Sequence, residues 1–264
     1  MRLAVCQLAA GDDIAANADT AEELVRQAAG QGARTVALPE YFLFYGDAAR
    51  FREVAVEHTP AAMERFSALA AELGVWLSLG SVLLEVPGSA KVANTSVIYD
   101  PAGAERARYA KRHLFDVDLP DRVYRESDVL EAGREIVSVG IEGWTAGLSI
   151  CFDLRFPEHY AALVQAGAEL LLVPAAFTAV TGKAHWEPLL RGRAIETQCY
   201  LAAAAQTGEC GGGKVCHGHS MIVDPWGAIL AELPEGVGVA AADLDRQKVD
   251  SVRQSVPMRR PPRS

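Results

Sequence analysis

The chain has 264 residues, half of them hydrophobic, so it is long enough to bury a large core, and we expect residues 1–264 to form one domain. Its 25 Lys and Arg residues against 34 Asp and Glu residues give a formal net charge of −9, which repels phosphate polyanions and argues against a nucleic-acid partner. No stretch approaches the roughly 20 apolar residues that a bilayer-spanning helix needs, so we expect no membrane span.

Five cysteines are spread along the chain, an odd number without the dense spacing of a disulfide scaffold. Cys6 and Cys199 lie in apolar segments and are expected to be buried, inert thiols. The segment 1–8 enters a strand-like alternation directly, without the basic and apolar regions of a signal peptide. We therefore expect a cytoplasmic protein.

The N-terminal third alternates between strands and helices. The pattern predicts a helix that is capped by Thr59, has Pro60 in its first turn and ends at Gly74. The other predicted elements of this part are a strand over 2–8, a helix over 17–31, a strand over 35–38 and a long apolar run over 75–84.

Two strands then flank the turn sequence Asp100-Pro101-Ala102-Gly103, which indicates antiparallel pairing and hence a mixed sheet. Three consecutive glycines, Gly211 to Gly213, predict a flexible loop over 208–214. The remaining predictions are strands over 144–150, 169–173 and 200–205, helices over 157–167 and 185–198, two or three short strands between 219 and 242, and an extended, proline-rich C-terminal arm over 253–264.

Three reactive side chains directly follow predicted strands. Glu40 follows Val36-Ala37-Leu38-Pro39, Lys111 follows Tyr109-Ala110, and Cys151 follows Leu148-Ser149-Ile150. Ligands gather at the carboxyl ends of strands in sheets that alternate with helices. Each residue alone is compatible with a structural role, but together they supply a base, a cation and a nucleophile.

The motifs around these residues resemble those of the nitrilase superfamily of carbon–nitrogen hydrolases. They are Leu38-Pro39-Glu40-Tyr41-Phe42, Tyr109-Ala110-Lys111-Arg112-His113-Leu114-Phe115 and Ser149-Ile150-Cys151-Phe152-Asp153-Leu154-Arg155-Phe156-Pro157-Glu158. The segments 184–198 and 218–227 extend the resemblance over nearly the whole chain. The resemblance implies a four-layer αββα sandwich, in which two mixed sheets pack face to face with helices outside. It also implies a Glu-Lys-Cys triad.

A cysteine nucleophile needs a base or a cation, because a thiol with an ordinary pKa near 8.5 is mostly protonated at neutral pH. Glu40 can accept the proton of Cys151 and later return it to the leaving group. Lys111 and the backbone N–H of Phe152 can stabilise the negative charge that develops on the carbonyl oxygen. This chemistry requires neither a metal nor an organic cofactor.

Further site residues are candidates of lower rank. Glu126 matches an additional glutamate that related enzymes place in the site, although a solvated loop carboxylate is the alternative. Arg155 can hold a substrate carboxylate in bidentate geometry, or it can pair with Asp153, Glu158 or Glu187. The predicted pocket-lining residues are Phe152, Phe177, Thr178 and His185, although for His185, as for His113, a structural hydrogen-bonding role is the favoured interpretation.

Rival interpretations fit less well. A zinc site built from Cys210, Cys216, His217 and His219 lacks a typical ligand spacing. A serine hydrolase is excluded because Cys151 stands where the nucleophile-elbow motif requires glycine. A catalytically silent scaffold protein is the non-enzymatic alternative, which the intact Glu, Lys and Cys argue against.

Within the superfamily, the segments 185–208 and 218–221 resemble the deaminated glutathione amidases, with the ω-amidases as neighbours. Both branches imply hydrolysis of a small amide that carries a carboxylate. An N-carbamoyl amino acid amidohydrolase or a true nitrilase remains an alternative inside the superfamily. The resemblance also implies a homodimer or a higher homo-oligomer.

Overall fold

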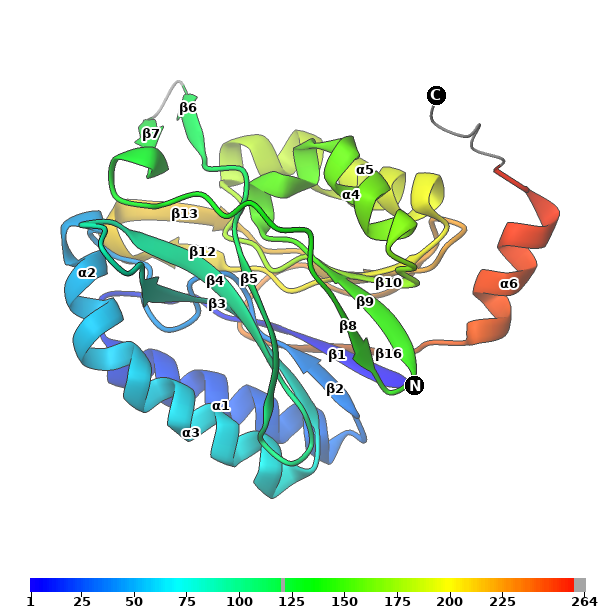
Figure 1. Cartoon of the computed structure of the whole chain (residues 1–264), viewed down its shortest axis with the longest axis horizontal. Helices are drawn as coiled ribbons and strands as arrows, with labels where there is room; N and C mark the ends of the chain where they lie inside the picture. Colours follow the sequence, from blue (N-terminus) through cyan, green and yellow to red (C-terminus); the bar gives the residue numbers. More distant parts are fainter. Residues whose placement is uncertain (120–121, 259–264) are drawn as a thin grey trace.

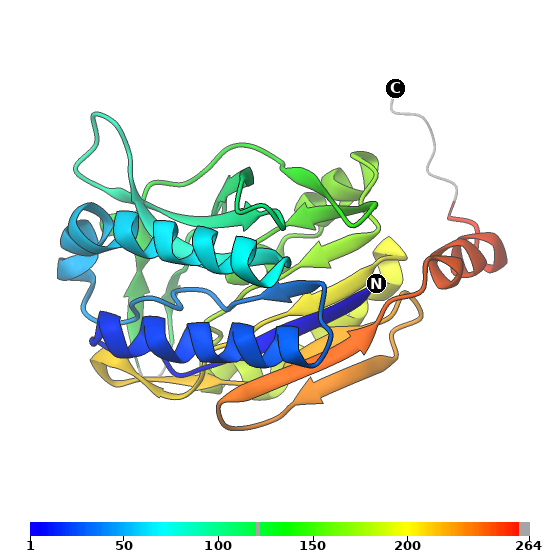
Figure 2. The same cartoon turned by 90° about the horizontal axis from the view of Figure 1, so that it is seen from below.

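Two six-stranded mixed sheets pack face to face in the computed structural model, which describes residues 1–119 and 122–258. Helices cover both outer faces, with one pair above the sheets and another below them in Figure 1, and Figure 2 shows the lower pair from outside. The predicted αββα sandwich is therefore confirmed. Within the described residues, no helix is long and apolar enough to cross a membrane.

The first sheet has the strand order β16-β1-β2-β3-β4-β5. β1, β2 and β3 run parallel, whereas β4, β5 and β16 join by antiparallel pairing. The bounds are β1 Arg2–Gln7, β2 Thr35–Ala37, β3 Trp76–Glu85, β4 Val92–Tyr99, β5 Glu105–Ala110 and β16 Gly238–Asp243.

The second sheet has the order β15-β14-β11-β10-β9-β8, with a parallel centre of β9, β10 and β11. The bounds are β8 Ser138–Ile141, β9 Trp144–Leu148, β10 Leu170–Leu172, β11 Tyr200–Ala203, β14 Ser220–Val223 and β15 Ile229–Leu233. Two small hairpins lie at one end of the sandwich (Figure 1): β6 Asp116–Asp118 with β7 Val123–Arg125, and β12 Thr207–Cys210 with β13 Lys214–His217.

The helices are α1 Ile14–Gly30, α2 Phe51–Glu53, α3 Thr59–Leu73, α4 Pro157–Gln165, α5 Ala179–Thr197 and α6 Arg246–Ser255. α1 and α3 lie against the first sheet, and α4 and α5 lie against the second (Figure 1). Asp13 caps α1 by accepting a hydrogen bond from the N–H of Ala16, and Gly74 ends α3 with a left-handed φ of 63°.

The pleat of β1 explains how the two sides of a sheet are filled. Leu3 and Val5 belong to the buried cluster that includes the second sheet, whereas Ala4 and Cys6 belong to the cluster under α1 and α3. Successive side chains of a strand point to opposite faces. The centre of the strand, residues 3–6, is therefore apolar on both faces, since both faces are buried.

Several predicted boundaries are wrong for identifiable reasons. Thr59 does not cap a helix, because the chain is already helical from Ala48 and the Thr59 hydroxyl donates back to the carbonyl oxygen of Val54. The helix predicted over 185–198 begins at Ala179, since Thr178 accepts a hydrogen bond from the N–H of Thr181 and caps it. The strand predicted over 144–150 ends at Leu148.

The glycine-rich segment 208–214 is part of the β12–β13 hairpin instead of a flexible loop, because Gly212 and Gly213 both adopt a φ of 66° in its turn. The arm predicted over 253–264 is also partly corrected. Arg253 to Ser255 still belong to α6, which buries Val249 and Val252 at helical spacing. The last six residues of that arm lie outside the described residues.

Candidate active site

Glu40, Lys111 and Cys151 follow β2, β5 and β9 and converge at one end of the sandwich. Gly80 in β3 makes the approach of the first segment possible, because a Cβ atom there would lie 1.8 Å from the carbonyl oxygen of Leu38. Only glycine therefore lets the chain before Glu40 pass so close to β3. The register of the β3–β4 pairing shifts at the same place.

Lys111 lies between two carboxylates. Its Nζ donates to Oε1 of Glu40 at 2.9 Å and to Oε2 and Oε1 of Glu126 at 2.8 and 3.0 Å. The lysine side chain is 1% exposed and that of Glu40 is 2% exposed. Two negative charges thus surround one positive charge in a site with little access for water.

Glu40 is held by donors from three further segments. The side-chain amide of Asn94 donates to Oε1 at 2.9 Å, and the N–H of Ala176 donates to Oε2 at 2.8 Å. The side-chain amide of Gln206 donates to the backbone carbonyl of Glu40 at 2.9 Å. These contacts fix the carboxylate in one orientation in the cavity that Cys151 also lines.

Cys151 begins a 3-10 turn, Cys151–Arg155, in a left-handed conformation with a φ of 46°. A side chain at positive φ is uncommon outside Gly, Asn and Asp, and such strain is frequent at functional sites. The N–H of Cys151 donates to the carbonyl oxygen of Pro174 at 2.9 Å, which holds the turn against the end of β10. The thiol is thereby fixed at a sharp bend after a strand.

Burial and the neighbouring charges set the protonation state of the site. Burial raises the pKa of the Cys151 thiol well above its ordinary value, the Glu40 carboxylate raises it further, and Lys111 works in the opposite direction. Burial also raises the pKa of Glu40, against the attraction of Lys111. For Lys111 burial acts to lower the pKa, but the charges of Glu126 and Glu40 outweigh it and the pKa is raised. The resting site therefore holds a protonated thiol and an ammonium ion.

A cavity of about 210 Å³ opens onto these groups. Glu40, Lys111, Glu126 and Cys151 line its floor, and aromatic side chains form much of its wall. A space of this size fits a small organic molecule, and the combination of apolar walls with a few convergent polar groups is typical of a ligand site. The aromatic lining residues are Tyr41, Tyr45, Phe51, Phe115, Tyr124, Phe152 and Phe177.

The model of the family described as carbon–nitrogen hydrolase matches residues 2–254. The chain belongs to this family. The resemblance noted from its motifs is thus confirmed. A deaminated glutathione amidase from Synechocystis is 43% identical over 258 residues, and the match covers 96% of this chain and 95% of the relative.

Two solved structures resemble this carbon–nitrogen hydrolase over nearly its whole length. The NitFhit protein of C. elegans matches with a TM-score of 0.92 and 41% identity, over 97% of this chain but only 63% of that longer one. An amidase from Nesterenkonia sp. AN1 matches with a TM-score of 0.82 and 29% identity, over 97% of both chains. That structure is a glutamate-to-glutamine mutant in which acrylamide has added to the active-site cysteine.

The other predicted site residues of this hydrolase fall into two groups. Glu126 belongs to the buried network, where the Tyr41 hydroxyl and the N–H of Phe115 also donate to it, at 3.0 and 2.8 Å. Phe152, Phe177 and Thr178 line the cavity, with Thr178 at the start of α5.

Arg155 and His185 lie beside the cavity and are absent from its described lining. Arg155 contacts Nδ1 of His185 at 3.4 Å and lies over the ring of Phe177 at 5.1 Å. Across residues 1–119 and 122–258, it forms none of the ion pairs with Asp153, Glu158 or Glu187 that the sequence left open. The structure thus gives His185 a contact with the Arg155 guanidinium, in line with the structural role favoured from the sequence, and not a place in the described cavity lining.

Several residues of the site carried no recognisable signal in the sequence. Asn94 lies within β4, and Gln206, although it follows the strand predicted over 200–205, is an uncharged amide like Asn94 and so did not stand out as a reactive group. Tyr41 lies inside a quoted motif without an assigned role. Lys214, on the β12–β13 hairpin, also lines the cavity. Pairing between distant segments brings these residues in, and only the folded chain reveals it.

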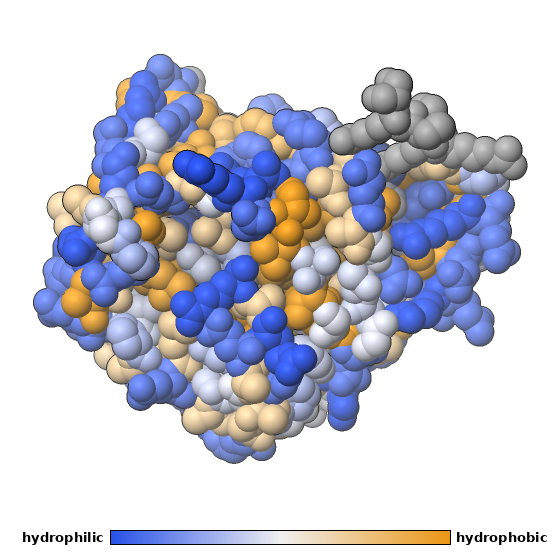
Figure 3. All heavy atoms as spheres, in the orientation of Figure 1, coloured by the Kyte–Doolittle hydropathy of each residue, from blue (hydrophilic) through white to orange (hydrophobic). Residues whose placement is uncertain are grey.

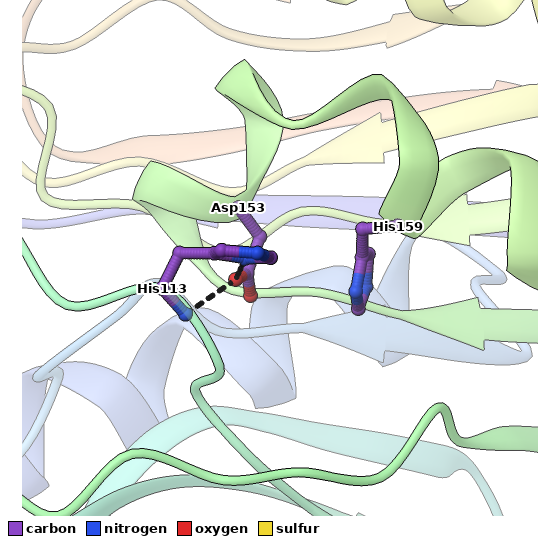
Figure 4. A group of neighbouring side chains, drawn as sticks. All are labelled: His113, Asp153 and His159. Carbon is purple, nitrogen blue, oxygen red and sulfur yellow. Dashed lines mark hydrogen bonds and ion pairs between the residues drawn. The ribbon is translucent and has the colours of Figure 1, made fainter.

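A second polar cluster supports the nucleophile turn. His113, Asp153 and His159 lie close together (Figure 4) and are the described residues grouped closely enough to be considered as metal ligands. Their atoms already have protein partners. Asp153 accepts from the N–H and ring of His113, at 3.0 and 2.6 Å, and from the Tyr109 hydroxyl and the N–H of Ile150, at 2.6 and 2.8 Å.

His159 is likewise engaged, since its Nε2 contacts the carbonyl oxygen of Leu148 at 3.0 Å and its Nδ1 contacts Arg112 at 3.3 Å. Asp153 accepts hydrogen bonds from Tyr109 and His113, which lie on either side of Lys111 in the sequence, and from Ile150, which precedes Cys151. The cluster therefore connects the segment that carries Lys111 to the segment that carries Cys151. Because its polar atoms are already hydrogen-bonded within the protein, we interpret it as a structural network and not as a metal centre.

Proposed function

We propose that this chain hydrolyses a small amide that carries a carboxylate, of the deaminated glutathione or 2-oxo acid ω-amide type, to the acid and ammonia or an amine. The observation that carries the proposal is the meeting of the Cys151 thiol, the Glu40 carboxylate and the Lys111 ammonium at the floor of one cavity. The name of the Synechocystis relative supports the choice of substrate class.

In the first half-reaction, the Cys151 sulfur attacks the amide carbon while Glu40 accepts the thiol proton. A base at this moment is essential, because burial and the Glu40 charge keep the thiol protonated at rest. Glu40 then passes the proton to the departing nitrogen as the carbon–nitrogen bond breaks. The products of this step are a thioester on Cys151 and ammonia or an amine.

In the second half-reaction, water attacks the thioester carbon and Glu40 accepts a proton from the water. The carbon–sulfur bond breaks, the proton returns to the sulfur, and the free acid leaves. Both halves pass through an oxyanion, for which we propose Lys111 and the N–H of Phe152 as donors. Two contacts of Lys111 go to the same Glu126 carboxylate, so one donor can turn to substrate without loss of either ion pair.

Glu126 is proposed to orient Lys111 and to keep it charged, since its carboxylate is the strongest influence that raises the pKa of that lysine. Arg155 is a proposed substrate-binding residue at the edge of the site. We also propose that residues 1–264 form one domain and that the protein acts in the cytoplasm as a homodimer or higher homo-oligomer. The five cysteines are free thiols, as a reducing compartment would keep them.

Ammonia or amine release from deaminated glutathione, 2-oxoglutaramate and an N-carbamoyl amino acid tests the proposal. We expect the wild type to hydrolyse one of the first two, and Cys151→Ala to lose the activity. Cys199→Ala is the matched control, because that thiol is buried and lies outside the cavity lining. Turnover of the carbamoyl compound alone would contradict the substrate class, and turnover of none would favour a silent scaffold.

A further inference from the structure

Lys214 places an ammonium group in the wall of the catalytic cavity. It is the first residue of β13, and it lines the same cavity as Cys151, Glu40 and Lys111. Its side chain is half-buried. The face of the molecule in Figure 3 is covered by interspersed polar and apolar side chains. A half-buried cation inside a ligand cavity needs a partner of opposite charge or a strong set of acceptors.

The acceptors that Lys214 has are neutral. Its Nζ donates to the carbonyl oxygens of Gly46 at 2.6 Å and Gly211 at 3.4 Å, and it lies 4.6 Å from the centre of the Tyr45 ring. Over residues 1–119 and 122–258, no carboxylate comes within ion-pair distance of it. An ammonium group has three donors, so these two carbonyls leave room for a further acceptor.

The other lysine of the cavity differs in this respect. Lys111 is neutralised by Glu40 and Glu126, and the nearby Arg125 pairs with Asp118 at 2.6 Å. Burial and the positive charge of Arg122 act to lower the pKa of Lys214, with Asp12 acting in the opposite direction. An anion bound beside Lys214 would relieve both unfavourable effects.

We propose that Lys214 binds the carboxylate of the substrate and so selects acidic amides over neutral ones. This inference rests on the proposed function and adds to it the residue that reads the charge of the substrate. The carboxylate would accept the remaining N–H of Lys214 while the amide lies at Cys151, and the aromatic wall between them would hold the apolar part of the molecule.

The geometry also suggests how Lys214 is kept in place. A Cβ atom on Gly211 would lie 2.5 Å from the carbonyl oxygen of Tyr45, so the turn of the β12–β13 hairpin packs directly against the 45–46 backbone. Lys214 bridges the two segments through their carbonyls. A purely structural clamp is therefore the competing explanation, and the experiment must separate it from carboxylate binding.

The test compares glutaramate with glutaramide, in which a neutral carboxamide replaces the carboxylate. Wild type, Lys214→Met, Lys214→Arg and the control Lys183→Met, a change of an exposed lysine on α5, are assayed for ammonia release. A hydrogen bond between charged groups predicts a fall of about tenfold to a hundredfold in kcat/KM of Lys214→Met for glutaramate, mainly through KM. Glutaramide should be hydrolysed almost as before, and Lys214→Arg should retain much of the preference.

Equal losses for the two amides would overturn the inference in favour of a clamp, and so would an unchanged preference. Glutarate serves as a probe that needs no chemistry. It should raise the melting temperature of wild type and Lys183→Met but not of Lys214→Met, and equal stabilisation of all three would also overturn the inference. If the wild type hydrolyses no amide, the proposed function fails, whereas loss of charge selection alone leaves that function intact.

Discussion

Replacement of Lys111 by methionine isolates the role of the buried cation. The change keeps a long apolar stem but removes the ammonium group that contacts Glu40 and Glu126. The Glu40 carboxylate keeps the Asn94 amide and the Ala176 N–H as donors. Glu126 keeps the Tyr41 hydroxyl and the Phe115 N–H. The variant therefore buries two carboxylates that retain hydrogen bonds but have lost their counter-ion.

Loss of one partner from a buried ion pair typically costs about 3–5 kcal/mol. Because each carboxylate keeps two donors, we expect the lower end, about 3 kcal/mol of unfolding free energy at pH 7. For a chain of this length, with an unfolding entropy of roughly 2 cal/mol/K per residue, that corresponds to a fall in melting temperature of about 5 °C. Removal of an oxyanion donor should also lower kcat by about a hundredfold to a thousandfold.

The loss of stability should depend on pH in a defined direction. Burial already raises the pKa of Glu40, and removal of Lys111 raises it further. A carboxyl group with a raised pKa destabilises the folded state while it is ionised, and protonation relieves the effect. The difference from wild type should therefore be largest near pH 8 and smaller near pH 5.

Chemical denaturation and calorimetry between pH 5 and pH 8 measure these effects. Lys248→Met is the matched control, since Lys248 pairs with Asp224 at 3.3 Å but is 40% exposed, and such a pair contributes at most about 1 kcal/mol. If Lys111→Met loses no more stability than Lys248→Met at pH 7, or if its deficit grows on acidification, the electrostatic account of the site is wrong.

Three further outcomes follow from the structure. Reaction of Cys151 with a dithiodipyridine reagent should be slow at pH 7 and rise up to pH 9 without a plateau, since burial and Glu40 raise the pKa of the thiol; a plateau below pH 8 would contradict this. Asp153→Asn should cost about 2–4 kcal/mol by denaturation at pH 7, because four donors lose a charged acceptor. Hydrogen bonds, chiefly from His113, lower the pKa of Asp153 despite its burial. The stability lost in Asp153→Asn should therefore stay constant down to about pH 4 and then shrink, and a loss that grows on acidification would argue against this role. Light scattering after size exclusion should give at least twice the 28.2 kDa mass of one chain, and a clean monomer would refute the oligomer.

The three reactive residues could be predicted because their signals are local, whereas the sandwich followed only from the resemblance of their motifs to the nitrilase superfamily. Glu40, Lys111 and Cys151 each directly follow a predicted strand, and helix ends such as Gly74 carry their own conformational requirement. Motifs of this kind can be recognised in the sequence without any knowledge of which strands pair. The order of the strands in each sheet and the small strands β6, β7 and β8 carried no comparable signal.

Other features depend on contacts between distant segments. Asn94 and Gln206 reach Glu40 across 54 and 166 positions of sequence, so their roles cannot be inferred from neighbours in the chain. Three consecutive glycines predict flexibility, but the positive φ values of Gly212 and Gly213 serve a tight hairpin turn. Lys214 has no signal of its own in the sequence, because its position in the cavity wall exists only once the hairpin packs against residues 45 and 46.

The most direct test of the account is a search for an acyl group on Cys151. The protein is mixed with a carboxylate-bearing amide, quenched in acid within the first turnovers and mapped by mass spectrometry. The account predicts an adduct on Cys151 whose added mass is that of the substrate less ammonia or the amine, and no adduct in Cys151→Ala. Steady hydrolysis by Cys151→Ala, or an acyl group on any other residue, would contradict it.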